Sequence, residues 1–335
     1  MPDCDGERQA QHTQPDAEGR GRAARVKPAI VVVGGFLGAG KTTLILAAAR
    51  VLQQRGVRAA VILNDQGGEL VDTRLVEAHG VAADQVTGGC FCCRFPNLIE
   101  AIERVAAQQP EVIFAEAVGS CTDIAATTLR PLLRDYPGRY RIAPLTVVAH
   151  ERPENDDLRF LYDHQVAEAD IVVGRDVDAE EWLAEVLGGK IAAGGRRVPL
   201  DYDRYAAAEA ALAWFNGRAT VRAARPTSPA MLVGPLLDRL AAEVPGNVHL
   251  KLFTQCDAGY LKAALTGNSR EPRVEGSLDA SPSRMHEILL NVRALASPEE
   301  LRAIVEREFG VLEGAVTWQE VECFRPAAPV PYWRE

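Results

Sequence analysis

A glycine-rich segment near the start of the chain constrains its fold more than any other feature. Residues 35–42 read GFLGAGKT and match G-x-x-x-x-G-K-[ST], a pattern in which backbone N–H groups and a helix N-terminus surround nucleotide phosphates. The pattern needs a strand before it and a helix after it. Both are expected, because residues 29–33 are largely β-branched and residues 41–54 carry apolar residues at helical spacing. The segment predicts a strand–loop–helix unit of a parallel sheet.

The polar side chains of this loop have expected roles at a nucleotide. We expect the Lys41 ammonium to reach the β- and γ-phosphates and the Thr42 hydroxyl to ligate Mg²⁺. The other loop residues expected to bind the nucleotide are Gly35, Gly38, Ala39, Gly40 and Thr43. The alternative interpretation is a glycine-rich strand-to-helix turn without a ligand.

Two further predicted strands place acidic residues beside this loop. An apolar run at residues 59–63 is followed by Asn64 and Asp65, and a second run at 112–115 is followed by Glu116. Ligands of open parallel sheets bind at the carboxyl ends of the strands. We therefore expect Asp65 and Glu116 to ligate Mg²⁺ or to position an attacking water, with either acid able to take either role.

Strands and helices alternate along the first two thirds of the chain. Further strands are predicted at residues 142–149 and 171–173, and a helix follows Pro96. This alternation predicts βαβ units, so we expect an α/β fold of the P-loop NTPase type, with a parallel sheet and helices on both faces.

Beyond Asn216 the pattern changes to α+β. Helices are expected at 232–244 and 298–309, and strands at 249–253, 288–290 and 316–324. The expected limits are 1–27 for a disordered tail, 28–221 for the nucleotide-binding domain, 222–229 for a linker, 230–325 for a smaller α+β domain and 326–335 for a tail.

Charge and hydropathy narrow the classes of partner. The formal net charge is −9, and no cluster of Lys and Arg forms a basic stripe, which argues against nucleic acid. No apolar run is long enough to cross a bilayer, and the first 28 residues lack the apolar core of a secretory signal. We therefore expect a cytoplasmic protein without a membrane partner.

Three of the seven cysteines lie within four residues. Residues 88–93 read GGCFCC and contain Cys90, Cys92 and Cys93. The odd cysteine count argues against a disulfide framework, whereas clustered thiolates favour Zn²⁺ and similar metals. A fourth position remains for water, an acid such as Glu69 or an acceptor protein. The alternative is that these cysteines are small buried hydrophobes, which is the role we expect for the four other cysteines.

The motifs together resemble the CobW-like GTPases, relatives of the urease and hydrogenase nickel-insertion GTPases in the SIMIBI class. The likeness is carried by GGFLGAGKTTL at 34–44, the Asn64-Asp65 strand end, GGCFCC at 88–93 and the Glu116-x-x-Gly119 segment. Three longer stretches, at 116–132, 165–173 and 202–216, resemble one subgroup. HLKLF at 249–253 and LLNVRAL at 289–295 agree more weakly.

This resemblance implies a function. GTP binding and hydrolysis would gate the transfer of Zn²⁺ or Co²⁺ from Cys90, Cys92 and Cys93 to a client metalloprotein or metal-cofactor enzyme. Gly119 would join the nucleotide site, and a nucleotide-dependent homodimer is implied as well. Loops at Asp65 and Glu116 would be held by the γ-phosphate and Mg²⁺ and released on hydrolysis.

One motif of the resembled family is altered. Its guanine-reading Asn-Lys-x-Asp corresponds here to Arg175-Asp176-Val177-Asp178. Asp178 is retained and can accept hydrogen bonds from guanine, but loss of the Asn and Lys leaves ATP open as the nucleotide. Two other functions also stay open: a small-molecule kinase or metal-independent ATPase, and a non-catalytic nucleotide-binding metal sensor.

Overall fold

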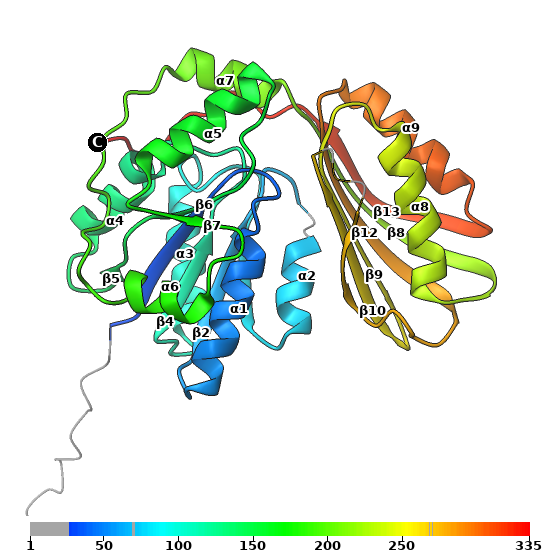
Figure 1. The fold of residues 1–335 in the computed structure, drawn as a ribbon, viewed down its shortest axis with the longest axis horizontal. Coiled ribbons are helices and arrows are strands. Elements are labelled where there is room, and N and C mark those ends of the chain that lie inside the picture. Colours follow the sequence, from blue (N-terminus) through cyan, green and yellow to red (C-terminus); the bar gives the residue numbers. More distant parts are fainter. Residues whose placement is uncertain (1–26, 69–70, 268, 270) are drawn as a thin grey trace, which may run out of the picture.

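A computed structural model describes residues 27–68, 71–267, 269 and 271–335. Nearly all of the expected N-terminal tail and the candidate metal ligand Glu69 lie outside these residues. The described chain forms two sheets with separate helical layers, shown side by side in Figure 1.

The first domain is built on a parallel sheet, as the sequence predicts. Its strand order is β3-β2-β4-β1-β6-β7, with the short β5 beside β1, and every pair is parallel. The strands are β1 (Ala29–Gly34), β2 (Ala59–Asn64), β3 (Ala82–Val86), β4 (Val112–Glu116), β5 (Arg141–Ile142), β6 (Thr146–Ala149) and β7 (Ile171–Gly174). The single strand predicted at 142–149 is wrong in detail, because Pro144 has no N–H and divides it into β5 and β6.

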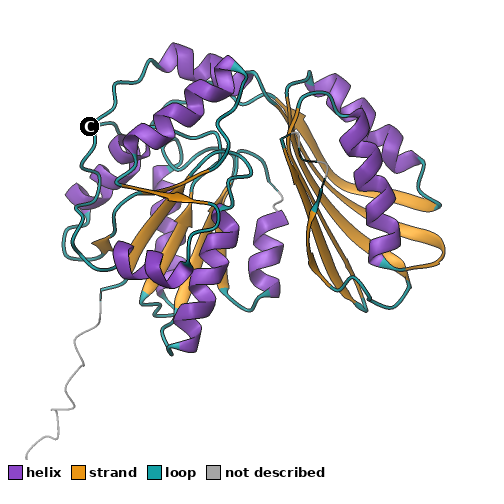
Figure 2. Ribbon diagram, viewed as in Figure 1, coloured by secondary structure: helices purple, strands orange, loops and turns teal. Residues whose placement is uncertain are grey.

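Helices cover both faces of this sheet, as the purple layers in Figure 2 show. They are α1 (Lys41–Gln54), α2 (Val71–Ala78), α3 (Phe95–Ala106), the π-helical turn η1 (Ala125–Leu129), α4 (Arg130–Asp135), α5 (Asp156–Glu168), α6 (Ala179–Val186) and α7 (Tyr202–Ala210). Alternate residues of each strand serve opposite cores. In β1, Val31 and Val33 pack with α1 and α6, whereas Ile30 and Val32 pack with α3, α5 and α7.

The second domain is an antiparallel sheet with helices on one face. Its strand order is β11-β10-β9-β12-β8-β13. The strands are β8 (Ala213–Thr227), β9 (Asn247–Cys256), β10 (Gly259–Thr266), β11 (Arg273–Gly276), β12 (Ser283–Ala294) and β13 (Gly314–Phe324). Helices α8 (Pro229–Glu243) and α9 (Pro298–Gly310) cover the face turned away from the first domain.

Two expected boundaries are wrong. Residues 222–227 belong to β8, and Ser228 caps α8, so no linker occupies 222–229. The exposed end of a long strand is polar and here has the composition of a linker. The segment expected as a free tail at 326–335 returns to the first domain, where Tyr332 N–H donates to the Cys92 carbonyl (2.8 Å) and Arg334 pairs with Asp123.

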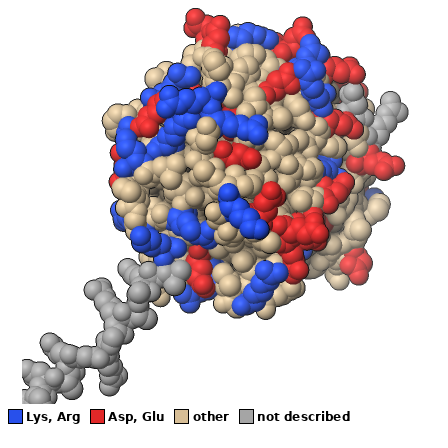
Figure 3. Space-filling model, turned by 60° about the vertical axis from the view of Figure 1, so that its left-hand side comes forward, with Lys and Arg blue, Asp and Glu red and all other residues tan. Residues whose placement is uncertain are grey.

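Charges of both signs occur over the face of the molecule shown in Figure 3. Among the described residues, no helix is long and apolar enough to cross a membrane.

Candidate functional site

The glycine-rich loop connects β1 to α1 at the carboxyl edge of the parallel sheet. Gly35 has a φ of 134°, and a Cβ there would lie 2.5 Å from the Val148 carbonyl oxygen, so only glycine fits. Lys41 is buried, and its Nζ donates to the carbonyls of Gly35 (2.8 Å) and Phe36 (3.3 Å). Burial lowers the pKa of Lys41, while the nearby Glu116 opposes that shift.

Thr42 and Glu116 meet at this loop. The Thr42 hydroxyl donates to Glu116 Oε1 over 3.1 Å, whereas the buried Oε2 has no hydrogen-bond partner among the described residues. Burial raises the pKa of Glu116, and the neighbouring Asp72 raises it further. A hydroxyl beside an unsatisfied carboxylate oxygen fits the oxygen preference of Mg²⁺.

Asp65 has a different partner from the one expected. Its carboxylate accepts two hydrogen bonds from Arg293 of β12, at 2.9 and 3.1 Å, and a third from Gly67 N–H at 3.0 Å. Arg293 is buried and lies 4.0 Å over the Trp214 ring. The second domain therefore reaches the strand end at which the sequence places a Mg²⁺ or water-positioning acid.

A cavity of about 210 Å³ lies between the glycine-rich loop and the second sheet. The expected site residues among its walls are Gly38, Gly40, Lys41, Thr42, Thr43, Asp65, Glu116 and Gly119. Gly35 and Ala39 belong to the same loop but do not line the cavity. Gly119 permits close packing, because a Cβ on it would lie 2.7 Å from Leu37 Cδ2 and 3.0 Å from the Leu37 backbone.

The structure adds cavity residues that the sequence analysis missed. They are Asp72 of α2, Arg175, and the second-domain residues His249, Lys251, Lys262, Arg273 and Arg293. The HLKLF and LLNVRAL segments contain three of them, at alternate positions of β9 and β12. Period-two alternation with basic residues on one face is the signal that indicates them.

The residues expected to read the base have structural partners. Asp178 is the N-cap of α6, where its Oδ1 accepts from Glu180 N–H and Glu181 N–H, both at 2.9 Å. Asp178 is not among the residues that line the cavity. Arg175 stands where the guanine-reading motif has Asn. Its side chain donates a hydrogen bond to the Gly38 carbonyl and so stabilises the phosphate loop.

The clustered cysteines lie behind the same strand ends. Cys90 and Cys92 are paired as a disulfide with Cα atoms 5.4 Å apart, a pairing that the argument against a disulfide framework did not foresee. The Cys93 sulfur lies 3.4 Å from that of Cys90 and 3.7 Å from that of Cys92. Three sulfurs from one short loop therefore converge, as GGCFCC predicts.

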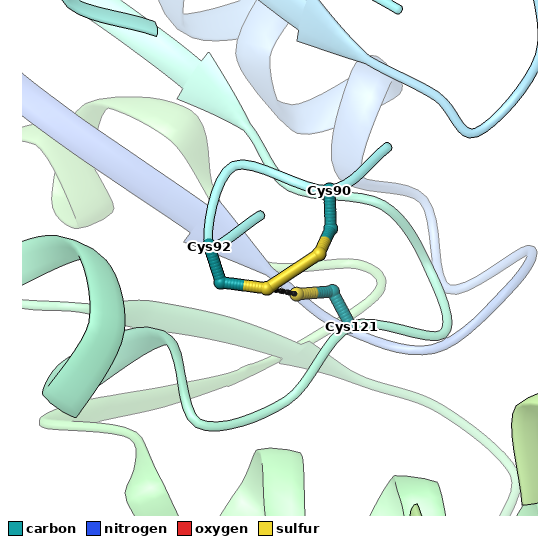
Figure 4. A group of neighbouring side chains, drawn as sticks. All are labelled: Cys90, Cys92 and Cys121. Carbon is teal, nitrogen blue, oxygen red and sulfur yellow. Dashed lines mark hydrogen bonds between the residues drawn. A yellow bond between two sulfur atoms is a disulfide. The ribbon is translucent and has the colours of Figure 1, made fainter. Parts of the chain in front are cut away.

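A fourth sulfur comes from a distant segment. Cys121 follows β4, and its Sγ lies 3.9 Å from that of Cys92; Figure 4 shows it facing the Cys90–Cys92 pair from the opposite side. The sulfurs of Cys90, Cys92 and Cys121 all lie within 4.8 Å of one another. The expectation that Cys121 is only a buried hydrophobe missed this. Cys121 follows Glu116 by five residues, and this position after a strand that ends at the nucleotide cavity is the sequence feature that could have indicated it.

Asn64 holds the cysteine loop in place. Its Nδ2 donates to the carbonyls of Val86 (2.9 Å) and Gly89 (2.8 Å), and its Oδ1 accepts from Phe91 N–H (2.8 Å). The next residue, Asp65, lines the nucleotide cavity. Adjacent residues of one strand end therefore contact the two candidate sites.

Two buried acids lie behind the cysteine cluster. Glu209 accepts from Ser120 Oγ (2.6 Å) and Gln66 Nε2 (3.0 Å), and burial raises its pKa to about 7. Glu168 accepts from Thr122 Oγ1 (3.0 Å) and Ala125 N–H (2.9 Å), and burial raises its pKa to about 8. Burial also raises the pKa values of the Cys93 and Cys121 thiols, so metal binding would release protons.

Known proteins match parts of this chain. Residues 29–187 match the family described as CobW/HypB/UreG, nucleotide-binding domain. The zinc chaperone YjiA of Escherichia coli (strain K12) is 40% identical over 73 residues, or 22% of this chain and 22% of that protein. The chain thus matches about a fifth of the length of this curated relative.

Solved structures were also compared. The zinc-bound YjiA GTPase from E. coli has 14% identity and a TM-score of 0.31, covering 84% of this chain and 98% of the other. HypB from Helicobacter pylori in complex with nickel has 18% identity and a TM-score of 0.33, covering 48% of this chain and 74% of the other.

The family match spans the glycine-rich loop, both acid-bearing strand ends and all four clustered cysteines. Residues 29–187, a little under half of the chain, therefore match the nucleotide-binding domain of the CobW/HypB/UreG family.

Proposed function

We propose that this protein hydrolyses GTP at the P-loop and couples that reaction to binding and release of Zn²⁺ or Co²⁺ at the cysteine cluster. The observation that carries the proposal is that the ends of β2 and β4 contribute residues to both the nucleotide cavity and the cysteine cluster. Asn64 and Asp65 follow one another at the end of β2, and Glu116 and Cys121 lie five residues apart after β4. In each pair, one residue lines the nucleotide cavity and the other contacts the cysteine loop or cluster.

The nucleotide step uses charge stabilisation by residues already in place. Backbone N–H groups of the loop and Lys41 bind the β- and γ-phosphates, and Thr42 with Glu116 holds Mg²⁺. Water attacks the γ-phosphorus and the β–γ anhydride bond breaks, so the products are GDP and inorganic phosphate. Asp65 can orient that water only after its carboxylate has separated from Arg293. Nucleotide binding would therefore change the contacts at the end of β2.

The metal step uses the convergent sulfurs. Tetrahedral Zn²⁺ with Zn–S bonds of about 2.3 Å has ligand sulfurs about 3.8 Å apart. The distances from Cys92 to Cys93 and Cys121 are 3.7 and 3.9 Å, so these two sulfur pairs have the spacing of ligands to such an ion, and Cys90, Cys92 and Cys121 form the group whose sulfurs all lie within 4.8 Å of one another. Cys90 and Cys92 would act as ligands only in the dithiol state, in which their S–S bond is absent and each thiol gives up its proton to bind the metal. Metal binding and the disulfide are therefore alternative states of the same sulfurs.

The wider function follows the family. The name zinc chaperone, carried by the curated relative, supports zinc as the cargo. The client is a metalloprotein or metal-cofactor enzyme, and a nucleotide-dependent homodimer and a cytoplasmic location are part of the proposal.

Phosphate release by reduced, metal-stripped protein tests the coupling. We expect GTP turnover that changes on adding one equivalent of Zn²⁺ or Co²⁺, and no metal effect in a C92S/C93S variant. Lys41→Ala should lower turnover by about a hundredfold or more, as loss of a charge-stabilising donor does, and should abolish nucleotide-dependent metal release. Turnover that ignores metal, or equal use of ATP, favours a kinase or plain ATPase. Tight binding without phosphate release favours a metal sensor.

A further inference from the structure

One face of the second sheet is basic and faces the phosphate loop. Strand alternation turns Leu250 and Leu252 of β9 toward α8 and α9, and turns His249 and Lys251 the opposite way. On β10 the same alternation places Leu261 and Ala263 in that core. Lys262 of β10 and Arg293 of β12 line the nucleotide cavity with His249 and Lys251.

Most of these basic groups have a partner or carry no charge. Arg293 pairs with Asp65, and Lys251 pairs with Asp72. Burial lowers the pKa of His249 well below its usual value, so its imidazole is neutral. Lys262 differs from them: it is only 9% exposed and makes no hydrogen bond or ion pair with the part of the chain that the structure describes. A buried ammonium without a hydrogen-bond partner is costly, because it gives up hydration, and here only the charges of the nearby carboxylates, Asp72 foremost, offset that cost.

The charge of the cavity wall supports an anionic ligand at this point. Six Lys and Arg face four Asp and Glu among the residues that line it. The second sheet also touches the phosphate loop, since a Cβ on Gly38 would overlap the Thr266 methyl group of β10. Lys262 lies four residues before Thr266 on the same face of β10, so it stands across the cavity from the loop.

We propose that Lys262 binds the terminal phosphate of a nucleoside triphosphate, so that the second domain closes the polyphosphate site opposite the P-loop. The inference rests on the proposed nucleotide site and extends it to a second domain. An ammonium offers three N–H donors, and phosphate oxygens supply the hydrogen-bond acceptors that the described chain does not give to Lys262. Loss of the γ-phosphate leaves Lys262 without its partner, so hydrolysis loosens the contact between the domains.

Affinity for triphosphate relative to diphosphate tests the proposal. Lys262→Met keeps the apolar stem and removes the charge, Lys262→Arg keeps the charge, and Lys190→Met changes an exposed lysine as the control. Calorimetric titration with GTPγS and GDP, and in parallel with ATPγS and ADP, measures each affinity. We expect Lys262→Met to weaken triphosphate binding about tenfold to a hundredfold, as loss of a charged hydrogen bond does, and diphosphate binding by less than about twofold. Lys262→Arg should keep most of the discrimination.

Thermal unfolding separates a ligand role from a structural one. The nucleotide-free K262M variant should melt at the same temperature as the parent or higher, because an unpaired buried charge has been removed, yet gain less from GTPγS. The inference is overturned if Lys262→Met leaves both the triphosphate affinity and the diphosphate affinity unchanged, or if it weakens both by the same factor. In either case the proposed nucleotide site would still stand. Failure of the parent protein to bind any of the four nucleotides overturns the proposed function as well.

Discussion

The nucleotide cavity and the cysteine cluster are supplied by the same two strand ends, but they treat buried polar atoms in opposite ways. Behind the cysteines, Glu168 and Glu209 each accept two hydrogen bonds from neighbouring groups. In the cavity, Glu116 Oε2 is buried without a hydrogen-bond partner in the described chain, and Lys262, which is 9% exposed, makes no hydrogen bond or ion pair there. Buried polar groups are normally paired. The two acids behind the cysteines are thus satisfied within the fold, although the nearby Gln165 Oε1 is not, whereas the cavity acid and lysine are the groups for which we propose a cation and an anion as partners.

The two regions also differ in how the fold assembles them. The cysteine cluster is closed: Cys90, Cys92 and Cys121 are all buried, and the C-terminal segment bonds to the Cys92 carbonyl. The cavity is formed between two domains and has room for a ligand. The proposed coupled cycle would need the cysteine cluster to open and the cavity to close, so the two regions start from opposite states.

The largest expected effect comes from Cys121, which tests whether the closed site is a four-sulfur site. Cys121→Ser should lower Zn²⁺ affinity by about a hundredfold or more, because even outer-shell changes at metal sites cost about 10- to 100-fold. Competition with a chromophoric chelator, under reducing conditions, measures this affinity. The visible absorption of the Co²⁺-loaded protein should also change, since one thiolate is lost from the coordination sphere.

A matched variant makes this prediction specific. Cys256→Ser alters a partly buried cysteine of the second domain and should leave both Zn²⁺ affinity and the Co²⁺ spectrum unchanged. Unchanged values in Cys121→Ser as well would mean that Cys121 packs beside the cluster without ligating.

Sequence predicted the parallel sheet and the residues of the phosphate loop because both are local patterns. Helix α1 begins and ends where apolar spacing places it, at Lys41 and Gln54. Cys121 and Lys262 were missed for a physical reason: each reaches its site only through tertiary packing, and neither belongs to a spaced motif. The composition of residues 222–229 indicated a linker, but pairing of β8 with β12 and β13 makes most of them strand.

Asn64 tests the connection between the two regions. Asn64→Ala removes two hydrogen bonds to the cysteine loop and one to Val86 at the end of β3, which should cost about 1–3 kcal/mol of stability for the groups left unpaired. Nucleotide should then no longer alter metal affinity, where coupling of this kind is typically about 5- to 150-fold. Zn²⁺ competition titrations with and without GTPγS measure the ratio.

The control for this variant is the exposed Asn155, an asparagine with a purely local role. Asn155 caps α5 by accepting from Asp157 N–H (3.0 Å) and Leu158 N–H (3.2 Å). Asn155→Ala should cost about 1 kcal/mol and leave the coupling ratio intact. Equal coupling in both variants would show that Asn64 does not carry the connection.

Glu168 should have the smallest effect on function, because its hydrogen bonds are complete without either ligand. Its pKa is about 8 in the fold and about 4.3 in an unfolded chain. Between those values the folded state keeps a proton that the unfolded state has lost, so the stability that this group contributes is full below about pH 4.3 and falls as pH rises toward 8.

Glu168→Gln keeps the shape and stays neutral, so stability measured by denaturant unfolding should decline less from pH 5 to 8 than in the parent. The difference in slope should be at most about 1.4 kcal/mol per pH unit, and metal affinity should not change. Substitution of the exposed Glu100 by Gln serves as the control. An unaltered slope of stability against pH in Glu168→Gln would show that Glu168 is ionised in the folded protein. The cysteine side would then also hold a buried charge.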